Sequence, residues 1–166
     1  MTWRVGILPP ASADPEPRSN LLPGSSGTRL ERRKRSPTPA CMLIKLSILA
    51  LCGALGTLAR YGLSVWVERA NPFEFPLGTL AVNLLGCFVF GLLWAIAESR
   101  TAGASELRLF ALIGFCGAFT TFSTLAFDGS LMLTRAQWSL LALNVGLSNV
   151  LGIGMVLLGL ALGRGL

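Results

Sequence analysis

The sequence predicts an all-α membrane protein with four transmembrane helices, the third of which is broken near its middle. Hydrophobic residues make up 52% of the 166 residues and charged residues 13%, and the mean hydropathy of +0.64 is too high for an ordinary soluble domain. Four stretches are apolar enough, and close enough to the length of about 20 residues, to cross a bilayer as helices. The third contains a run of glycine and hydroxyl residues, which weakens a helix.

Residues 1–41 differ in composition from the rest of the chain. They hold seven of the nine prolines and contain a basic run at 29–35. We expect a disordered leader at 1–41 and a membrane domain at 42–166. Two interpretations of the basic run stay open: it binds anionic lipid headgroups, at about 1 kcal/mol per residue, or translation starts at Met42 and the leader is never made.

The net charge of +6 does not indicate a nucleic-acid partner. Seven of the fourteen Lys and Arg residues lie in the leader, and the membrane domain has seven basic against five acidic residues. The sequence has no His, and three of its four Cys residues lie in apolar stretches, where a thiol packs as a small hydrophobic group. With no carboxylate embedded in a span and no nucleophile beside a base, the pattern is not that of an enzyme.

The first predicted span covers 43–67 and contains a charged side chain. Gly53, Gly56 and Arg60 share one helix face through their spacing. An Arg inside a span costs about 2.5–3.5 kcal/mol on insertion scales, so it should face a partner or water. Alternatively, its long side chain reaches back to the interface. The sequence leaves both interpretations open.

The second span, 77–97, follows a loop at 68–76 and has a polar face. Small and polar residues recur at four-residue intervals, at Thr79, Asn83, Cys87 and Gly91. Such a stripe usually means close helix packing. The Asn83 carboxamide must also find hydrogen bonds at bilayer depth, and its donors can serve a neighbouring helix or a passing anion.

The third span, 109–127, is interrupted by the run 114–124. In hydrocarbon an unpaired main-chain group is costly, so an opened turn survives only where protein or water meets it. We therefore expect an ion site at the break, where bared carbonyl oxygens suit a hard cation such as Na⁺. One chain offers too few carbonyls, and a second copy would complete the site. Phe115, Phe119 and Phe122 are expected on one side of this span, either as core or with ring edges turned to a small anion.

The last span, 136–163, opens with Trp138 as an interfacial anchor. Asn144, Ser148 and Gly152 form a second polar stripe, which we expect to face the first stripe across a dimer interface. Both stripes offer amide and hydroxyl groups but no Asp or Glu, and cation pathways and proton relays normally need a carboxylate. The lining therefore favours an anion.

Positive charges give the membrane domain only a weak preference for one orientation. Four basic residues lie on the side of its two ends, at Lys45, Arg100, Arg108 and Arg164, and two lie on the other side, at Arg69 and Arg135. A chain with so small a bias can insert both ways, which would let two copies pair antiparallel in the membrane.

Three motifs of the membrane domain, at 53–61, 78–86 and 114–124, resemble those of the CrcB/Fluc fluoride channels, and the likeness runs from Met42 to the C-terminus. The resemblance implies an antiparallel, dual-topology homodimer in the cell membrane, with two pores that conduct F⁻ passively and one structural Na⁺ that is not transported. It implies that Na⁺ is held by the backbone carbonyls of Gly117 and Thr120, that the pore is lined by Asn83, Thr121, Phe122, Ser123 and Ser148, and that Arg60 lies in the vestibule.

The sequence departs from the family pattern at two positions. Leu125 stands where a second phenylalanine is usual and Asn144 where a tyrosine is frequent, while Asp128 occupies the position of an acidic residue. Since Leu has no ring edge, conduction could be slower, or the chain could be one half of a heterodimer with a paralogous subunit. Two rivals are a small dual-topology multidrug exporter, which would need an embedded carboxylate in its first span, and a packing subunit that transports nothing.

Overall fold

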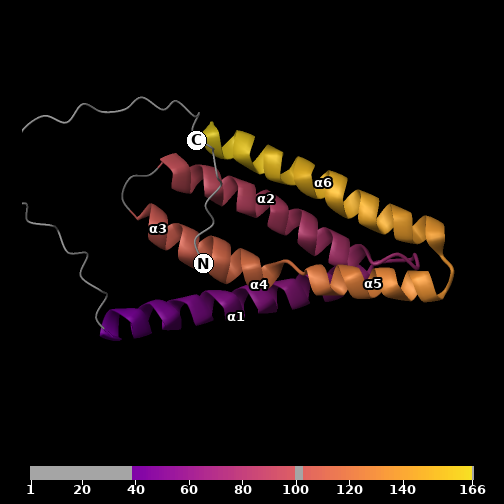
Figure 1. The fold of residues 1–166 in the computed structure, drawn as a ribbon, viewed down its shortest axis with the longest axis horizontal. Helices are drawn as coiled ribbons and strands as arrows, with labels where there is room; N and C mark the ends of the chain where they lie inside the picture. Colours follow the sequence, from indigo (N-terminus) through magenta and orange to yellow (C-terminus); the bar gives the residue numbers. More distant parts are fainter. Residues whose placement is uncertain (1–38, 100–102, 166) are drawn as a thin grey trace, which may run out of the picture. The chain divides into compact units, whose positions relative to one another are not determined.

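The structure, a computed structural model, describes residues 39–99 and 103–165, and every regular element in these ranges is helical (Figure 1). The elements in chain order are α1 (Pro39–Arg69), α2 (Leu77–Ser99), α3 (Ala104–Leu107), the π-helix η1 (Arg108–Cys116), α4 (Gly117–Phe119), α5 (Phe122–Thr134) and α6 (Trp138–Arg164). The predicted leader lies outside the described residues, except for 39–41, which begin α1.

Within residues 39–99 and 103–165, four helical stretches are long and apolar enough to cross a bilayer: α1, α2, the run Ala104–Thr134 from α3 to α5, and α6. We call the run from α3 to α5 the third crossing. The shortest stretch, α2, has 23 residues, and at 1.5 Å per residue it is about 35 Å long, against a hydrocarbon thickness of about 30 Å. The predicted all-α fold with four apolar spans is confirmed.

Successive crossings run in alternating directions, so α1 and the third crossing point one way and α2 and α6 the other (Figure 1). Among the described residues, two ion pairs join elements at the end where α1 begins and α6 ends: Lys45 Nζ lies 3.6 Å from Glu106 Oε1, and Arg164 Nη2 lies 3.4 Å from Glu98 Oε2. Both pairs are exposed and contribute at most about 1 kcal/mol each. Lys45 and Arg164 therefore share one end of the bundle, as predicted, whereas Arg100 lies outside the described residues.

Helices α2 and α6 pack closely because glycines remove the side chains between them. A Cβ added at Gly91 would overlap the Val156 carbonyl, and one added at Gly159 would overlap the Phe88 carbonyl. Main chain thus meets main chain, which is the usual consequence of small residues at a helix interface in membranes. The predicted close packing at Gly91 is confirmed.

The two polar stripes face each other within one chain, which corrects the expectation that they meet across a dimer interface. A Cβ at Gly152 would lie 3.6 Å from Cys87 Sγ, and Gly91 meets Val156 one turn further along both helices. The expectation was wrong because spacing and polarity show which face of a helix is small and polar, but not which copy of the chain covers that face.

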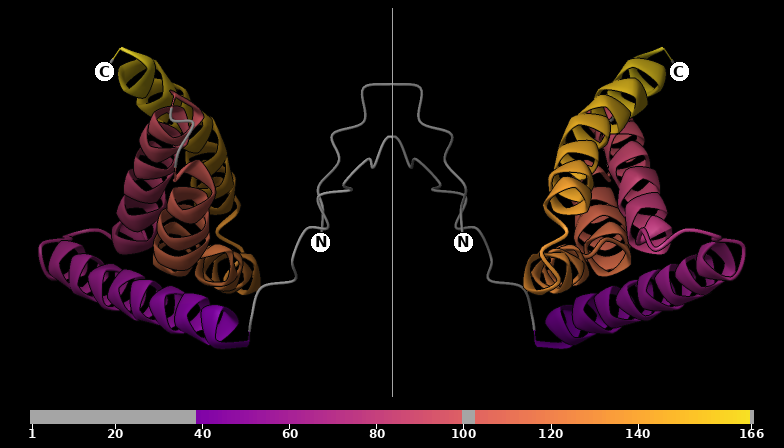
Figure 2. Two further views of the ribbon diagram at one scale, coloured as in Figure 1. Left: turned by 90° about the vertical axis from the view of Figure 1, so that its left-hand side faces the viewer. Right: turned by 90° about the vertical axis from the view of Figure 1, so that its right-hand side faces the viewer.

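Helix α1 rests on the third crossing through glycines of both elements (Figure 2). A Cβ at Gly56 would overlap the Phe115 carbonyl, and one at Gly114 would come within 2.9 Å of Cys52 Cβ. Gly56 is the one residue of α1 that is buried. The opposite face of α1 is apolar and exposed, so it suits contact with lipid or with a second copy.

Candidate functional site

The third crossing is broken at Thr120 and Thr121, where the chain passes from α4 to α5 (Figure 1). Thr120 has φ −78° and ψ 156°, and Thr121 has φ −144° and ψ 114°, so both residues are extended. The break lies within the predicted run 114–124, at the end rich in hydroxyl residues. The expectation of a broken third helix is confirmed.

The nine residues before α4 form the π-helix η1, which sequence reasoning missed. Such helices are rare, and short π-helical segments occur frequently at functional sites. No residue type in Arg108–Cys116 distinguishes a π-helix from an α-helix, because apolar residues occupy most of its positions on every side.

Asn83 on α2 holds the break open with both atoms of its carboxamide. Asn83 Nδ2 donates to the Thr121 carbonyl oxygen over 3.1 Å, and the Thr121 main-chain N–H donates to Asn83 Oδ1 over 2.8 Å. The side chain therefore pairs with an extended main chain as a neighbouring strand would. The predicted need of Asn83 for a hydrogen-bond partner is met by the break itself.

Thr121 caps the N-terminus of α5, and its hydroxyl forms hydrogen bonds with the hydroxyl residues that follow it in the run 114–124. Its Oγ1 accepts from the Thr124 main-chain N–H over 3.2 Å, and it forms hydrogen bonds with the hydroxyls of Ser123 at 3.2 Å and Thr124 at 3.0 Å. An N-cap of this kind contributes about 1 kcal/mol to helix stability. The cap makes α5 start afresh after the break.

These two arrangements release the carbonyls predicted to hold Na⁺. In a continuous α-helix the Gly117 carbonyl would accept from the Thr121 N–H and the Thr120 carbonyl from the Thr124 N–H. The first N–H goes to Asn83 and the second to the Thr121 hydroxyl. Two freed carbonyl oxygens fit a hard cation in ligand type, although one chain supplies too few of them to surround it.

The phenylalanines of the third crossing divide at the break, which corrects the expectation that all three lie on one side. Phe115 and Phe119 stack, with ring centroids 5.7 Å apart and planes 11° apart, and Phe119 is only 5% exposed. Phe122 is 80% exposed, and with Leu125 it lines an apolar groove between α5 and α6. The expectation was wrong because it took the spacing of the three residues as one uninterrupted helix. The two extended residues between Phe119 and Phe122 turn the Phe122 side chain away from the face that carries Phe115 and Phe119.

Arg60 lies at a hollow next to the break. The hollow has a volume of about 550 Å³, and its lining from α1, α2 and the break is mixed: hydroxyl-bearing residues and Arg60 lie beside apolar ones (Thr57, Ser64, Thr79, Thr121, Thr124; Leu58, Tyr61, Val65, Val82). A water molecule occupies about 30 Å³ in the liquid, so the hollow has room for a hydrated ion. Arg60 itself is half-buried at this hollow, and both interpretations of its side chain stay predictions.

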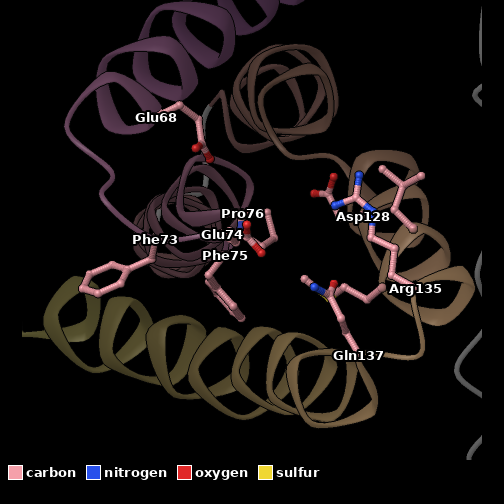
Figure 3. Close-up of a pocket in the computed structure, with 10 residues that line it drawn as sticks. Glu68, Phe73, Glu74, Phe75, Pro76, Asp128, Arg135 and Gln137 are labelled. Carbon is pink, nitrogen blue, oxygen red and sulfur yellow. The ribbon is translucent and has the colours of Figure 1, made fainter.

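A second hollow, of about 320 Å³, opens between the α1–α2 loop and the α5–α6 turn. Figure 3 shows Asp128 and Arg135 on one side of it and Glu68 on the side of α1. Thr79 Oγ1 donates to Asp128 Oδ2 over 2.9 Å, so a residue that lines the first hollow is bonded to one that lines the second. Glu68 Oε1 accepts from the Gly78 N–H over 2.7 Å and so caps the start of α2.

Within the described residues, the two predicted polar residues of α6 make no hydrogen bond to the break. Asn144 is buried, and the hydroxyl oxygen of Ser148, one turn later, is buried as well. Ser123 and Gly117, by contrast, are exposed at the surface of the chain. The structure therefore brings together Asn83, Thr121 and Thr124, and leaves Ser148 on a different helix.

Comparison with known proteins places this arrangement in a family. The model of the family described as CrcB-like protein, Camphor Resistance (CrcB), matches residues 47–160. The chain is 48% identical over 120 residues to the fluoride-specific ion channel FluC of Nitratidesulfovibrio vulgaris (strain Miyazaki F), covering 72% of this chain and 97% of that one. It is 47% identical over 120 residues to the protein of the same name from Desulforapulum autotrophicum, covering 72% and 96%. It is 48% identical over 120 residues to that of Nitrosococcus oceani, again covering 72% and 96%. With its four apolar crossings and its broken third helix, this chain is a multi-pass protein of the cell membrane and belongs to the CrcB family.

Proposed function

We propose that the chain is the subunit of a fluoride-specific ion channel that lets F⁻ leave the cytoplasm passively. The observation that carries the proposal is the pairing of Asn83 with the main chain of Thr121, because it keeps a polar opening in the middle of an apolar helix. The names of the relatives, which are fluoride-specific ion channels, agree with this function.

The chemistry around the break supports an anion. Amide and hydroxyl groups can donate hydrogen bonds in place of the water that a small anion loses, and Arg60 supplies a positive charge at the neighbouring hollow. Asp128, an acidic residue beside this surface, already accepts a hydrogen bond from Thr79. Fluoride accepts strong hydrogen bonds and has a small radius, so a lining of donors suits it.

A passive pathway is sufficient for this task. Hydrogen fluoride is neutral and crosses a bilayer, and it ionises where the pH is higher, so F⁻ accumulates in a cytoplasm that is less acidic than its surroundings. A charged ion is far less soluble in hydrocarbon than its neutral acid. A pore that conducts F⁻ down its gradient therefore lowers the cytoplasmic concentration without an energy source.

We propose further that two antiparallel copies hold one structural Na⁺ between their breaks. The freed carbonyls of Gly117 and Thr120 supply two oxygens in one chain, and two chains would supply four. Oxygen ligands of this kind suit a hard cation. The positive charge of the ion would offset the partial negative charges of the carbonyl oxygens where the two chains cross.

A heterodimer is the second candidate, and the residue that favours it is Leu125. It lines a groove together with the exposed ring of Phe122, and it stands where the resemblance implies a second phenylalanine, whose ring edge could face an anion. A paralogous subunit with an aromatic residue at the corresponding place would supply that ring.

The test is reconstitution of the purified chain alone. Liposomes loaded with potassium fluoride, in Na⁺-containing buffer, are diluted into fluoride-free buffer with a potassium ionophore, and a fluoride electrode follows the efflux. We expect fluoride efflux well above that of protein-free vesicles with the same load, and little efflux of chloride under the same conditions. Fluoride efflux equal to that of protein-free vesicles would contradict the homodimeric channel. If efflux then appeared on adding a paralogous subunit, that result would support the heterodimer.

A further inference from the structure

Arg108, the first residue of η1, carries a charge that no carboxylate of the described residues balances. At this end of the bundle the two carboxylates pair with other cations, Glu106 with Lys45 and Glu98 with Arg164. Within residues 39–99 and 103–165, Arg108 takes part in neither ion pair, and its buried Nε has no hydrogen-bond partner. A charged group at the edge of the hydrocarbon is costly without a counter-charge, so Arg108 requires an anion.

An aromatic ring of α2 covers one face of the Arg108 guanidinium. The guanidinium carbon lies 4.9 Å from the centroid of the Trp94 ring, which is within the range of a cation–π contact. This contact uses the face of the guanidinium and leaves the N–H donors at its edge for an oxygen ligand. Because Nε is buried while the residue as a whole is half-buried, the terminal nitrogens are the donors that a ligand can reach.

An apolar groove begins at the same tryptophan. It has a volume of about 270 Å³ and lies between α2 and α6, where it is lined by Phe90, Gly91, Trp94, Val156 and Leu160. Trp94 and Leu160 each lie one helical turn, about 6 Å, inside the Glu98–Arg164 ion pair. Phe90 stacks on Trp94 with ring centroids 6.3 Å apart and lies a further turn inside. The groove therefore extends from the charged end of the bundle toward the middle of the bilayer.

A positive charge at the head of an apolar groove matches the two parts of a phospholipid. Arg binds phosphate oxygens through the N–H groups at its edge, and basic residues between transmembrane helices bind lipid headgroups. A zwitterionic headgroup would bring a further cation to an end of the bundle that already holds Lys45, Arg108 and Arg164. An anionic headgroup brings none, so charge complementarity favours an anionic lipid.

We propose that Arg108, Trp94 and the groove between α2 and α6 form a binding site for one anionic phospholipid. The terminal nitrogens of Arg108 donate to the phosphate, and the Trp94 ring holds the guanidinium in place. One acyl chain lies in the groove against Phe90 and Leu160. The site is on the surface of the bundle, so the proposal is independent of which ion the chain conducts.

Fluorescence of Trp94 measures the proposed contact directly. In the full chain with the other three tryptophans, Trp3, Trp66 and Trp138, replaced by Phe, the tryptophan signal comes from Trp94 alone. Detergent micelles of this protein are titrated with brominated phosphatidylglycerol or with brominated phosphatidylcholine of the same acyl chains, because bromine quenches a tryptophan that it contacts. We expect phosphatidylglycerol to quench half of the signal at the lower concentration.

Two arginines at the same end form a matched pair. Arg108→Gln should raise the half-quenching concentration of phosphatidylglycerol about tenfold, which corresponds to the loss of a hydrogen bond between charged groups. Arg164→Gln removes the same charge, but Arg164 is exposed and pairs with Glu98, so it should leave that concentration unchanged. All variants keep residues 1–41, so any attraction of the basic run 29–35 for phosphatidylglycerol is common to them. Equal effects of the two substitutions would overturn the site, since they would indicate a general attraction to positive charge.

Thermal unfolding separates lipid binding from packing. Phosphatidylglycerol should raise the unfolding temperature of the unchanged chain more than phosphatidylcholine does, because a ligand of the folded state stabilises it. Arg108→Gln should abolish this difference between the two lipids, and Arg164→Gln should preserve it. If Arg108→Gln lowered the unfolding temperature equally in both lipids and the difference remained, Arg108 would only pack on Trp94 and the proposal would be overturned.

A substitution in the groove tests the acyl-chain half of the site. Leu160→Phe fills the groove and leaves Arg108 in place, so the proposal can be tested even where Arg108→Gln does not fold. Quenching by phosphatidylglycerol should then require a higher lipid concentration. Unchanged quenching would overturn the proposal, and a smaller fraction of dimer on size-exclusion chromatography would in that case assign the groove to a second copy of the chain. Equal quenching of the unchanged chain by the two lipids would overturn the preference for an anionic headgroup and the proposal with it.

Discussion

At the scale of single residues, three hydrogen bonds determine the shape of the break: two between the Asn83 amide and the Thr121 main chain, and one from the Thr124 N–H to the Thr121 hydroxyl. The bonds from the Thr121 and Thr124 N–H groups replace bonds that a continuous helix would have made. The bond from the Asn83 amide satisfies the Thr121 carbonyl, which the break exposes. Removal of the Asn83 amide would return the Thr121 N–H to the Gly117 carbonyl and favour an unbroken helix.

Replacing Asn83 therefore tests the break directly. Asn83→Leu should reduce fluoride efflux at least about a hundredfold and lower the free energy of unfolding by about 1–3 kcal/mol for each unmade hydrogen bond. Size-exclusion chromatography would report whether the variant still assembles. A channel should lose its flux even where the variant still assembles, whereas a packing subunit without transport should show no fluoride efflux before or after the substitution. Ser47→Ala, which removes an exposed hydroxyl bonded to its own helix at the Leu43 carbonyl, serves as a control for stability.

The sequence predicts that Asn83 needs a partner, but not that the partner is the main chain of Thr121. The two residues are 38 positions apart, and their meeting depends on how the second and third crossings are aligned. Glycine makes that alignment possible, since a Cβ at Gly86 would overlap the Thr120 methyl group. Phe122 was misplaced for a related reason, because its spacing from Phe119 spans the two extended residues.

At the scale of elements, glycine contacts determine how the helices pack. A Cβ at Gly159 would overlap the Phe88 carbonyl and lie 2.8 Å from the Leu92 nitrogen, whereas nothing lies within 4 Å of a Cβ at Gly154. The two positions belong to the same helix and differ only in what they face. They form a matched pair for measuring the α2–α6 interface.

Gly159→Ala should lower the free energy of unfolding by about 1–3 kcal/mol, because the added methyl group forces two main chains apart. Gly154→Ala should leave it unchanged or raise it by up to about 1 kcal/mol through the higher helix propensity of alanine. Thermal or denaturant unfolding in detergent gives both values. Equal effects of the two substitutions would contradict the close packing of α2 on α6.

Apolar length and small-residue spacing were sufficient to predict four spans and the tight face at Gly91. They were not sufficient to predict η1. This segment is itself apolar on nearly every side, and the change from α-helical to π-helical hydrogen bonds has no signature in its composition. The intrachain meeting of Cys87 with Gly152 was also missed, since a stripe identifies a face and not its neighbour.

At the scale of the whole molecule, the described helices leave much apolar surface to be covered. Leu51, Leu55 and Leu58 on α1 are each at least 60% exposed. Lipid and a second copy are the two environments that can cover such a surface in a membrane. The homodimer and its Na⁺ are predictions from the resemblance that a measurement must test.

Removal of Na⁺ provides that measurement. If Na⁺ binds only the folded dimer, its presence at one hundred times its dissociation constant stabilises the protein by about 2.7 kcal/mol. The unfolding temperature should therefore fall when sodium chloride is replaced by N-methylglucamine chloride at the same ionic strength, and the fraction of dimer on size-exclusion chromatography should fall with it. Choline chloride should act like N-methylglucamine chloride. Identical unfolding temperatures in all three salts would contradict a structural Na⁺.

The pairing of Asn83 with Thr121 also bears on biogenesis. The ribosome completes the second crossing before the third, so the carboxamide of Asn83 is already in the bilayer when the extended segment around Thr121 leaves the translocon. The main-chain N–H and carbonyl of that segment can therefore form hydrogen bonds with Asn83 as soon as they enter the bilayer, and they need not lie unpaired in lipid. A chain with these two helices in the reverse order would have to insert the opening first, with nothing there to receive it.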